Sequence, residues 1–300
     1  MLHSTIVDRT RGCILGGAVG DAMGGAFEGE VGPVEVGDHR HWSISDDTQL
    51  TLATCESIIE LSGAVEPEHI AGRFVQWFRD RRISGMGSST LKALRDLDAG
   101  LHWALAGAKG EMAAGNGAAM RIAPLSFHLD PTRAKARQVI RDVCRITHHN
   151  EEAYAGALAV ALAIRYLALD VTEPRTLFDA VLQHLPDSRV RDRILELNKL
   201  SDERSVAEVG IEFGSSGYVV ESVPVAIYAA RFVDRLPFNE VIRNAIEAGG
   251  DTDTVASITG QIAGAWIGAE QIPRALIDSI PGVQSIERIA DQFAQTMQSS

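Results

Sequence analysis

The sequence predicts an all-α fold, and three observations carry that prediction. Apolar side chains recur at spacings of three and four residues along most of the 300-residue chain. Runs of alternating β-branched residues, which are typical of half-buried strands, are almost absent. Residues suited to helix N-termini precede several of the apolar segments.

The first expected helices lie between the N-terminal region and the middle of the chain. Residues 48–61 carry a broad apolar stripe that ends at Gly63, a residue suited to a left-handed C-terminal cap. Pro67 occupies the first turn of the next helix, whose apolar residues continue to Phe78. Ser88 can cap a further helix that contains three leucines.

The second half of the chain continues the pattern. Residues 131–147 form another helix, and Asn150 can cap a long Ala-rich helix that runs to about Leu169. Small side chains let neighbouring helices approach closely, so we expect this helix to be the most buried one. Further amphipathic segments lie at 173–184, 187–200, 220–234, 238–248, 253–268 and 283–297. The polar stretch 185–206 is expected to be a peripheral insertion.

Glycine is used heavily, and its clusters have a predicted place in the fold. The chain has 28 glycines, and they gather at 12–37, 85–87, 107–117, 210–217 and 249–250. We expect these clusters to lie between the helices, in loops that let a ligand approach the backbone closely.

Composition and charge set the limits of the function. With 45% hydrophobic residues the chain can bury a sizeable core, and we expect a single domain over residues 1–300. The net charge of −12, with no run of Lys or Arg, argues against nucleic acids and anionic membranes as partners. The first ten residues lack a secretory signal, and the most apolar stretch, 155–169, contains Arg165 and is too short to span a bilayer. We therefore expect a cytoplasmic protein that is a monomer or a weak dimer.

The three cysteines are predicted to be buried thiols. Cys13, Cys55 and Cys144 are widely spaced, and each lies in an apolar segment. Cys144 lies one helical turn before His148, so a cysteine nucleophile is possible in principle, but packing explains the residue better.

Two short acidic clusters carry the chemistry. They are Ser45-Asp46-Asp47-Thr48, and Asp251-Thr252-Asp253-Thr254 behind Gly249-Gly250; each opens a helical segment. One Asp in each cluster is explained by capping of the helix N-terminus. The other Asp and the hydroxyl groups are the oxygen ligands that hard divalent cations such as Mg²⁺ or Mn²⁺ prefer. We interpret the two clusters as halves of one metal site.

A further loop has two explanations. The segment Gly85-Met86-Gly87-Ser88-Ser89-Thr90 directly precedes a helix. Its N–H groups can cradle a phosphate, or it can be a tight turn with Ser88 as N-cap. The residues alone favour the turn.

The order of the motifs resembles the ADP-ribosylglycohydrolases over nearly the whole chain. The motifs are Gly20-Asp21 with Glu28, Ser45-Asp46-Asp47-Thr48, Gly115-Asn116-Gly117-Ala118-Ala119-Met120-Arg121, Thr147-His148-His149 and Gly249-Gly250-Asp251-Thr252-Asp253-Thr254. Tyr218 adds to the similarity with the bacterial branch that includes the dinitrogenase reductase-activating glycohydrolase. The resemblance implies an orthogonal multi-helix bundle with two Mg²⁺ or Mn²⁺ ions in a cleft. It also implies an enzyme that cleaves the bond joining ADP-ribose to an acceptor.

The resemblance also implies roles for individual residues. One ion would be held by Ser45, Asp46 and Asp47 and the other by Asp253 and Thr254, with Asp251 or Asp253 bridging toward both. The implied substrate contacts are Asn116, Gly117 and Met120 at the ribose and diphosphate, and His148 at the adenine or its ribose. A phosphate cradle formed by Gly85, Gly87, Ser88 and Ser89 becomes as good an explanation as the turn. No aromatic residue stands just before Gly115 to stack on adenine, so Tyr218 is the candidate from another loop.

Cleavage at the anomeric carbon needs a group that protonates the leaving atom and a group that activates water. Glu28 and Asp47 are the candidates, without an assignment of which does which, and Glu28 is also a candidate metal ligand or gate. Without the resemblance, Glu28 is explained as an exposed loop carboxylate and Asp21 as a local cap.

The expected partner is an ADP-ribosylated protein or a small molecule that contains ADP-ribose. The bacterial branch favours ADP-ribosyl-arginine as substrate. Ser-linked ADP-ribose, O-acetyl-ADP-ribose, and a non-catalytic ADP-ribose-binding or structural role are the alternatives. A dimetal phosphoesterase is a further one, with His148 and His149 as its only candidate histidine ligands.

Overall fold

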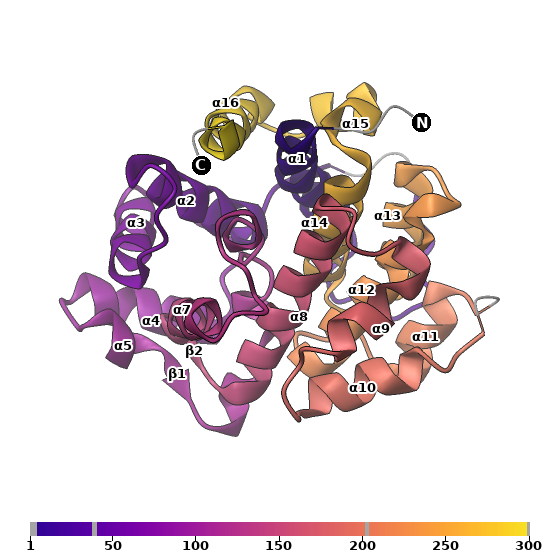
Figure 1. The fold of residues 1–300 in the computed structure, drawn as a ribbon, viewed down its shortest axis with the longest axis horizontal. Coiled ribbons are helices and arrows are strands. Elements are labelled where there is room, and N and C mark those ends of the chain that lie inside the picture. The colour runs from indigo at the N-terminus through magenta and orange to yellow at the C-terminus, as the bar shows by residue number, and fades with distance from the viewer. Residues whose placement is uncertain (1–4, 38–40, 202–203, 299–300) are drawn as a thin grey trace.

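The computed structural model describes residues 5–37, 41–201 and 204–298, and within them the chain is almost entirely helical (Figure 1). The all-α prediction is confirmed. The α-helices are α1 (Ile6–Gly24), α2 (Asp46–Glu60), α3 (Pro67–Arg79), α4 (Ser88–Asp98), α5 (Trp103–Ala106), α6 (Leu125–His128), α7 (Ala134–Arg145), α8 (Glu151–Ala168), α9 (Leu177–Leu182), α10 (Arg189–Leu197), α11 (Val206–Phe213), α12 (Val219–Ala230), α13 (Phe238–Glu247), α14 (Thr252–Ile267), α15 (Arg274–Asp278) and α16 (Val283–Gln295).

Short elements connect these helices. The 3₁₀ helices are η1 (Gly25–Phe27), η2 (Glu111–Ala113), η3 (Asn116–Ala118), η4 (Pro174–Thr176), η5 (Arg231–Asp234), η6 (Ala269–Gln271) and η7 (Thr296–Gln298). Strands β1 (Ala108–Lys109) and β2 (His148–His149) pair in parallel. No helix in the described ranges is both long enough and apolar enough to cross a bilayer.

Helices α1 and α14 run antiparallel in direct backbone contact. A Cβ placed on Gly16 would lie 2.3 Å from the carbonyl oxygen of Gly260, and one on Gly264 would lie 2.0 Å from that of Gly12. At the other end of the contact, the Thr252 hydroxyl donates to the carbonyl oxygen of Gly24. The contact therefore places the C-terminal end of α1 beside the first turn of α14.

The glycines of α1 correct the prediction that residues 12–37 form a loop between helices. Glycines 12, 16, 17, 20 and 24 lie inside α1, and almost the whole helix is buried. A helix that is enclosed on all sides has no polar stripe, so its sequence lacks the amphipathic pattern by which the other helices were found. The regular spacing of four residues between glycines was the available signal.

Most of the predicted helices are confirmed within a few residues. Asn150 caps α8 as predicted, because its side chain accepts hydrogen bonds from the N–H groups of Glu152 and Ala153. Ser88 is not a cap: it is the first residue of α4, and Gly87 occupies the N-cap position.

The stretch 185–206 is not peripheral in its middle part. It contains α10, whose Val190, Ile194 and Leu197 are fully buried. Helix α10 packs against α8 and α12. Its polar residues occupy only the outer face, which explains why the segment looked like an insertion.

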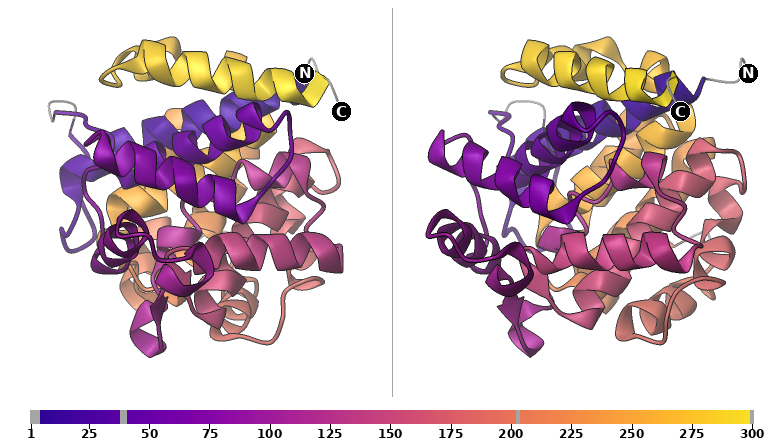
Figure 2. Two further views of the ribbon diagram at one scale, coloured as in Figure 1. Left: turned by 90° about the vertical axis from the view of Figure 1, so that its left-hand side faces the viewer. Right: turned by 60° about the vertical axis from the view of Figure 1, so that its left-hand side comes forward.

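Helix α16 lies across one side of the molecule, over α1 and α2 (Figure 2). Its apolar face, which includes Ile289 and Phe293, is fully buried there. The C-terminal segment thus holds α2 against α1, and both helices contribute to the site described below.

A substitution at the contact between α1 and α14 tests its importance. Gly16→Ala places a methyl group on a backbone oxygen that cannot rotate away, so we expect a loss of about 1–3 kcal/mol in unfolding free energy. Gly72→Ala is the matched control, because a Cβ on this residue of α3 meets no heavy atom within 4 Å. The control should be neutral or stabilising by up to about 1 kcal/mol. Urea denaturation followed by circular dichroism measures both, and an unchanged Gly16→Ala protein would contradict the close contact.

Candidate active site

A cavity of about 510 Å³ opens where the N-terminal ends of α2, α4 and α14 meet. The two acidic clusters, which are about 200 residues apart in the chain, both line it. The predicted site residues on its wall are Glu28, Asp46, Asp47, Gly85, Gly87, Ser88, Ser89, Asn116, Gly117, Met120, His148, Asp251, Asp253 and Thr254. Ser45 and Tyr218 do not line it.

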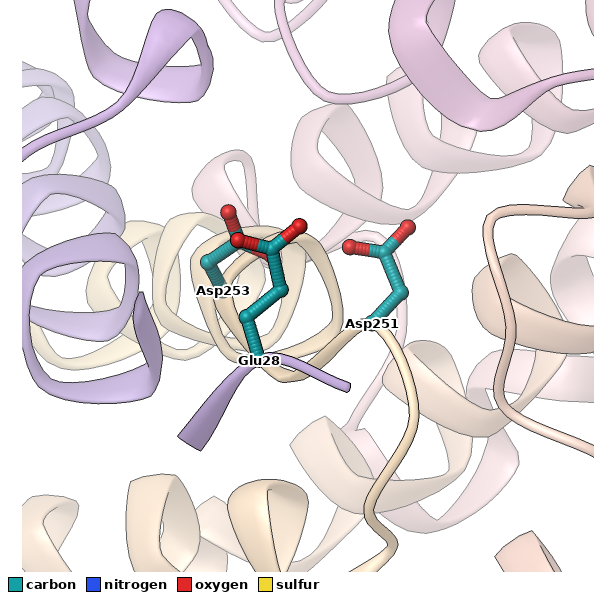
Figure 3. A group of neighbouring side chains, drawn as sticks. All are labelled: Glu28, Asp251 and Asp253. Atoms are coloured by element: carbon teal, nitrogen blue, oxygen red, sulfur yellow. The ribbon is translucent and has the colours of Figure 1, made fainter. Parts of the chain in front are cut away.

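Three carboxylates gather on one side of the cavity. Ligand oxygens of Glu28, Asp251 and Asp253 lie within 4.8 Å of one another, and Figure 3 shows the groups facing the same space. Glu28 follows η1, whereas Asp251 and Asp253 begin α14, so the contact between α1 and α14 brings them together. This acidic triad could hold a metal ion.

Asp251 is fixed from a third part of the chain. The side-chain amide of Asn116 donates to Asp251 Oδ2 at 2.7 Å and to Ser222 Oγ at 3.0 Å. Asn116 was predicted as a substrate contact. In this structure it also orients a carboxylate of the acidic triad.

Asp47 adds a buried carboxylate beside the triad. Its Oδ2 accepts a hydrogen bond from the Thr254 hydroxyl at 3.2 Å, whereas its Oδ1 is buried and has no partner among the described residues. Burial, and then the negative charge of Asp253, raises the pKa of Asp47 well above its usual range. An unpartnered buried oxygen in a crowd of carboxylates is what a bound cation would satisfy.

The pKa values of two neighbouring carboxyl groups are raised as well. Burial, followed by the charge of Asp21, raises the pKa of Asp46 to about 7. Burial, followed by Asp251, raises the pKa of Asp253 to about 9. The carboxylates of this cluster and the Thr254 hydroxyl offer oxygen ligands, so the site suits a hard divalent cation better than a thiophilic one.

Asp21 and Ser45 build the N-terminus of α2. The carboxylate of Asp21 accepts hydrogen bonds from the backbone N–H groups and hydroxyls of Ser45 and Thr48. Ser45 Oγ in turn accepts from the N–H of Asp47, so Ser45 is the N-cap. Asp21 is therefore a cap, as the sequence suggested, but it lies in α1 and caps the N-terminus of α2. It fixes the direction in which Asp46 and Asp47 leave α2, and the ligand role of Ser45 stays a prediction.

Another part of the cavity wall offers hydrogen-bond donors. Ser88, Ser89 and Thr90 lie in the first turn of α4, which has no side-chain cap. The backbone N–H groups of a first helical turn lack partners within the helix and lie at its positive end. The cavity wall thus combines carboxylates with the N–H donors of a first helical turn.

His148 borders the cavity from β2 and is buried. A Cβ on Gly117 would lie 2.8 Å from His148 Cε1, so glycine is required at 117 for the ring to lie there. Burial, and then the charge of Arg121, lowers the pKa of His148 to about 3. The imidazole is therefore neutral at physiological pH and is not a general acid.

The rim differs from the prediction in one respect. Tyr218 Oη lies 3.4 Å from Arg189 Nη1 outside the cavity, so its stacking role has no support from its position. Met112 lines the cavity instead, and its side chain is 95% exposed. Sequence reasoning missed Met112, Ser216 and Gly217 because none carries a charge or a motif of its own.

The cysteines lie away from the cavity. All three are buried and free, as predicted. Burial raises the pKa of the Cys144 thiol to about 12, which makes it unreactive.

The family model for ADP-ribosylglycohydrolases matches residues 2–300. The chain belongs to this family. Relatives include the ADP-ribosylhydrolase ARH3 of Mus musculus, 27% identical, with 98% of this chain and 93% of that protein covered. The ADP-ribosylarginine hydrolase Tri1 of Serratia proteamaculans is also 27% identical, with 97% and 80% covered. A solved structure titled ADP-ribosylglycohydrolase-related protein complex is 27% identical, covers 97% of this chain and 99% of its own, and has a TM-score of 0.77. The protein is a hydrolase of glycosidic bonds.

The crowded carboxylates predict a linked dependence on pH and cations. The pKa values of Asp46 and Asp253, about 7 and about 9, lie above the ordinary 3.8. The folded metal-free protein therefore holds protons that the unfolded chain releases, and its stability should fall as pH rises through this interval. Divalent cations should raise the melting temperature, and more at about pH 8 than at about pH 5, where protons compete for the carboxylates.

Thermal unfolding with EDTA, Mg²⁺ or Mn²⁺ measures this effect. Sodium chloride at equal ionic strength is the control for general screening. A melting temperature that stays the same with and without divalent cations at both pH values would contradict a metal site in the cavity.

Proposed function

We propose that the enzyme hydrolyses the bond between ADP-ribose and an acceptor side chain, with ADP-ribosyl-arginine on a protein as the favoured substrate. One observation carries the proposal: a single cavity joins an oxygen-rich acidic side, suited to cations, to a donor-rich side, suited to a diphosphate. The name of the relative Tri1, an ADP-ribosylarginine hydrolase, supports the arginine linkage.

Two divalent cations, Mg²⁺ or Mn²⁺, fit the acidic side. Asp46, Asp47, Asp251, Asp253 and Thr254 would hold them, with Ser45 and Glu28 as further ligands. When bound, such ions orient sugar hydroxyls and lower the pKa of water. The unpartnered oxygen of Asp47 and the raised pKa values of its neighbours support this assignment.

The donor side would bind the rest of the substrate. The first turn of α4, with Ser88 and Ser89, offers N–H groups to the diphosphate, and Gly85 and Gly87 leave room for its oxygens. Asn116, Gly117, Met120 and His148 would line the ribose and adenine part. Met112 replaces the missing aromatic residue as the apolar contact for adenine, since it lines the cavity and is open to solvent.

Glu28 and Asp47 are the proposed acid and base pair. Cleavage creates positive charge at the anomeric carbon, and the leaving nitrogen or oxygen must gain a proton. Glu28 is exposed and Asp47 is buried, so only Glu28 can exchange protons directly with bulk water. This difference favours Glu28 for proton transfer to and from the solvent side, and Asp47 for holding the attacking water.

We place the enzyme in the cytoplasm, as one domain over residues 1–300 and as a monomer or weak dimer. Nucleic acid and membrane surfaces are not expected partners, since the net charge of −12 repels both.

Removal of single carboxylates tests the site. Asp253→Ala and Asp251→Ala should each lower the rate of ADP-ribose release at least ~100-fold, because an electrostatic group at the reaction centre is lost. The helical circular dichroism signal should persist. Asp278→Ala is the control, since Asp278 is exposed and pairs with Arg274 at the surface. Full activity in either site variant would contradict the assignment.

The linkage is tested with a panel of substrates. Free ADP-ribose is measured from ADP-ribosyl-arginine peptide, ADP-ribosyl-serine peptide and O-acetyl-ADP-ribose, each with Mg²⁺ or Mn²⁺. Fastest release from the arginine peptide is expected. Faster release of ADP-ribose from another substrate would show that arginine is not the preferred linkage. Release of phosphate would indicate a phosphoesterase, and binding without turnover would indicate a non-catalytic member of the family.

A further inference from the structure

A polar relay lies behind His148 in the interior. Arg121 Nη2 lies 2.7 Å from Thr147 Oγ1, and Thr147 Oγ1 lies 2.8 Å from His148 Nδ1. Arg121 and Thr147 are fully buried, and His148 is 4% exposed. None of the chemistry described above uses Arg121 or Thr147.

The relay has a preferred direction. A guanidinium group only donates hydrogen bonds, so Thr147 Oγ1 is the acceptor for Arg121. The Thr147 hydroxyl can then donate its own hydrogen to His148 Nδ1. The opposite arrangement, with the hydrogen on Nδ1, would leave the buried Thr147 O–H without an acceptor, which is unfavourable. The neutral imidazole therefore carries its hydrogen on Nε2.

The second ring nitrogen borders the cavity. Within the described ranges, no protein group pairs with His148 Nε2. A Cβ on Gly117 would lie 3.3 Å both from His148 Nε2 and from Thr90 Oγ1 in the first turn of α4. The Nε2–H group thus adds a donor to the wall that already presents the N–H groups of α4.

Arg121 is poorly satisfied for a buried charge. Its Nε and Nη1 have no hydrogen-bond partner in the described structure, and its guanidinium lies 4.7 Å from the centre of the Phe74 ring. An incompletely paired buried cation costs stability, and an apolar side chain of similar volume would pack there without that cost. This cost points to a role for the charge beyond packing.

We propose that Arg121 and Thr147 are positioning residues that hold His148 in its Nε2–H form, so that it donates a hydrogen bond to an oxygen of the bound ADP-ribose unit. The identity of the ligand rests on the proposed function; the state of the ring does not. His148 then recognises an acceptor on the substrate and takes no part in proton transfer.

Nitrogen NMR of the imidazole tests the ring state without a substrate. The chain has nine histidines, so the His148 signals are assigned by their loss in His148→Gln. We expect Nε2 protonated and Nδ1 unprotonated from about pH 5 to about pH 8. Thr147→Val, which keeps the shape but removes the hydroxyl, should shift the ring toward the Nδ1–H form, and Thr147→Ser should restore the original form. Protonation of Nδ1 in the unaltered protein, or an unchanged ring in Thr147→Val, would overturn the proposal.

Calorimetric titration with ADP-ribose tests the consequence for binding. Thr147→Val should weaken binding about 10-fold, the cost of one misdirected hydrogen bond, and Thr147→Ser should stay within about 2-fold. Equal affinity in Thr147→Val, despite a changed ring, would overturn the recognition role. If the unaltered protein binds no ADP-ribose, the proposed function and the recognition role fail, and the NMR result alone decides the tautomer.

Discussion

The fold is organised around the backbone contact between α1 and α14. Glycines spaced four apart let the two helices approach without intervening side chains. The approach fixes how the C-terminal end of α1 meets the first turn of α14. Asp21 and Glu28 come from the first helix and the loop behind it, and Asp251 and Asp253 come from the other. A wider separation would move one half of the acidic site away from the other.

This arrangement places several carboxyl groups close together, and hydrogen bonds from the surrounding residues stabilise some of them. Asp21 is satisfied by the N-terminus of α2, and Asp251 is held by Asn116. Burial raises the pKa values of Asp21, Asp46, Asp47 and Asp253, and the charges of neighbouring carboxylates raise those of Asp46, Asp47 and Asp253 further. A site of this kind is organised for a cation and for the anionic ligand that the cation helps to bind. Family membership gives the chemical class, hydrolysis of a glycosidic bond, in which such a site acts.

Much of the fold and of the cavity could be predicted from the sequence, for reasons that differ between the elements. Helices with one solvent-exposed face, such as α3 and α7, have a clear amphipathic pattern. Helix α1 lacks that pattern, since almost the whole helix is buried, and its glycines look like loop residues. Asp46 and Asp253 stand out because clustered carboxylates at helix starts exceed what capping needs. Thr147 and Arg121 could not be assigned, because their importance comes from contacts that only the packed structure creates. Tyr218 was the candidate for stacking on adenine because no aromatic residue precedes Gly115, but it does not line the cavity.

The most direct measurement is anomalous scattering from crystals grown with Mn²⁺. Manganese peaks are expected inside the cavity, between the start of α2 at Asp46 and Asp47 and the start of α14 at Asp251 and Asp253. A cavity without manganese, with peaks only at surface carboxylates, would contradict the claim that α1 and α14 are packed together to build one shared cation site.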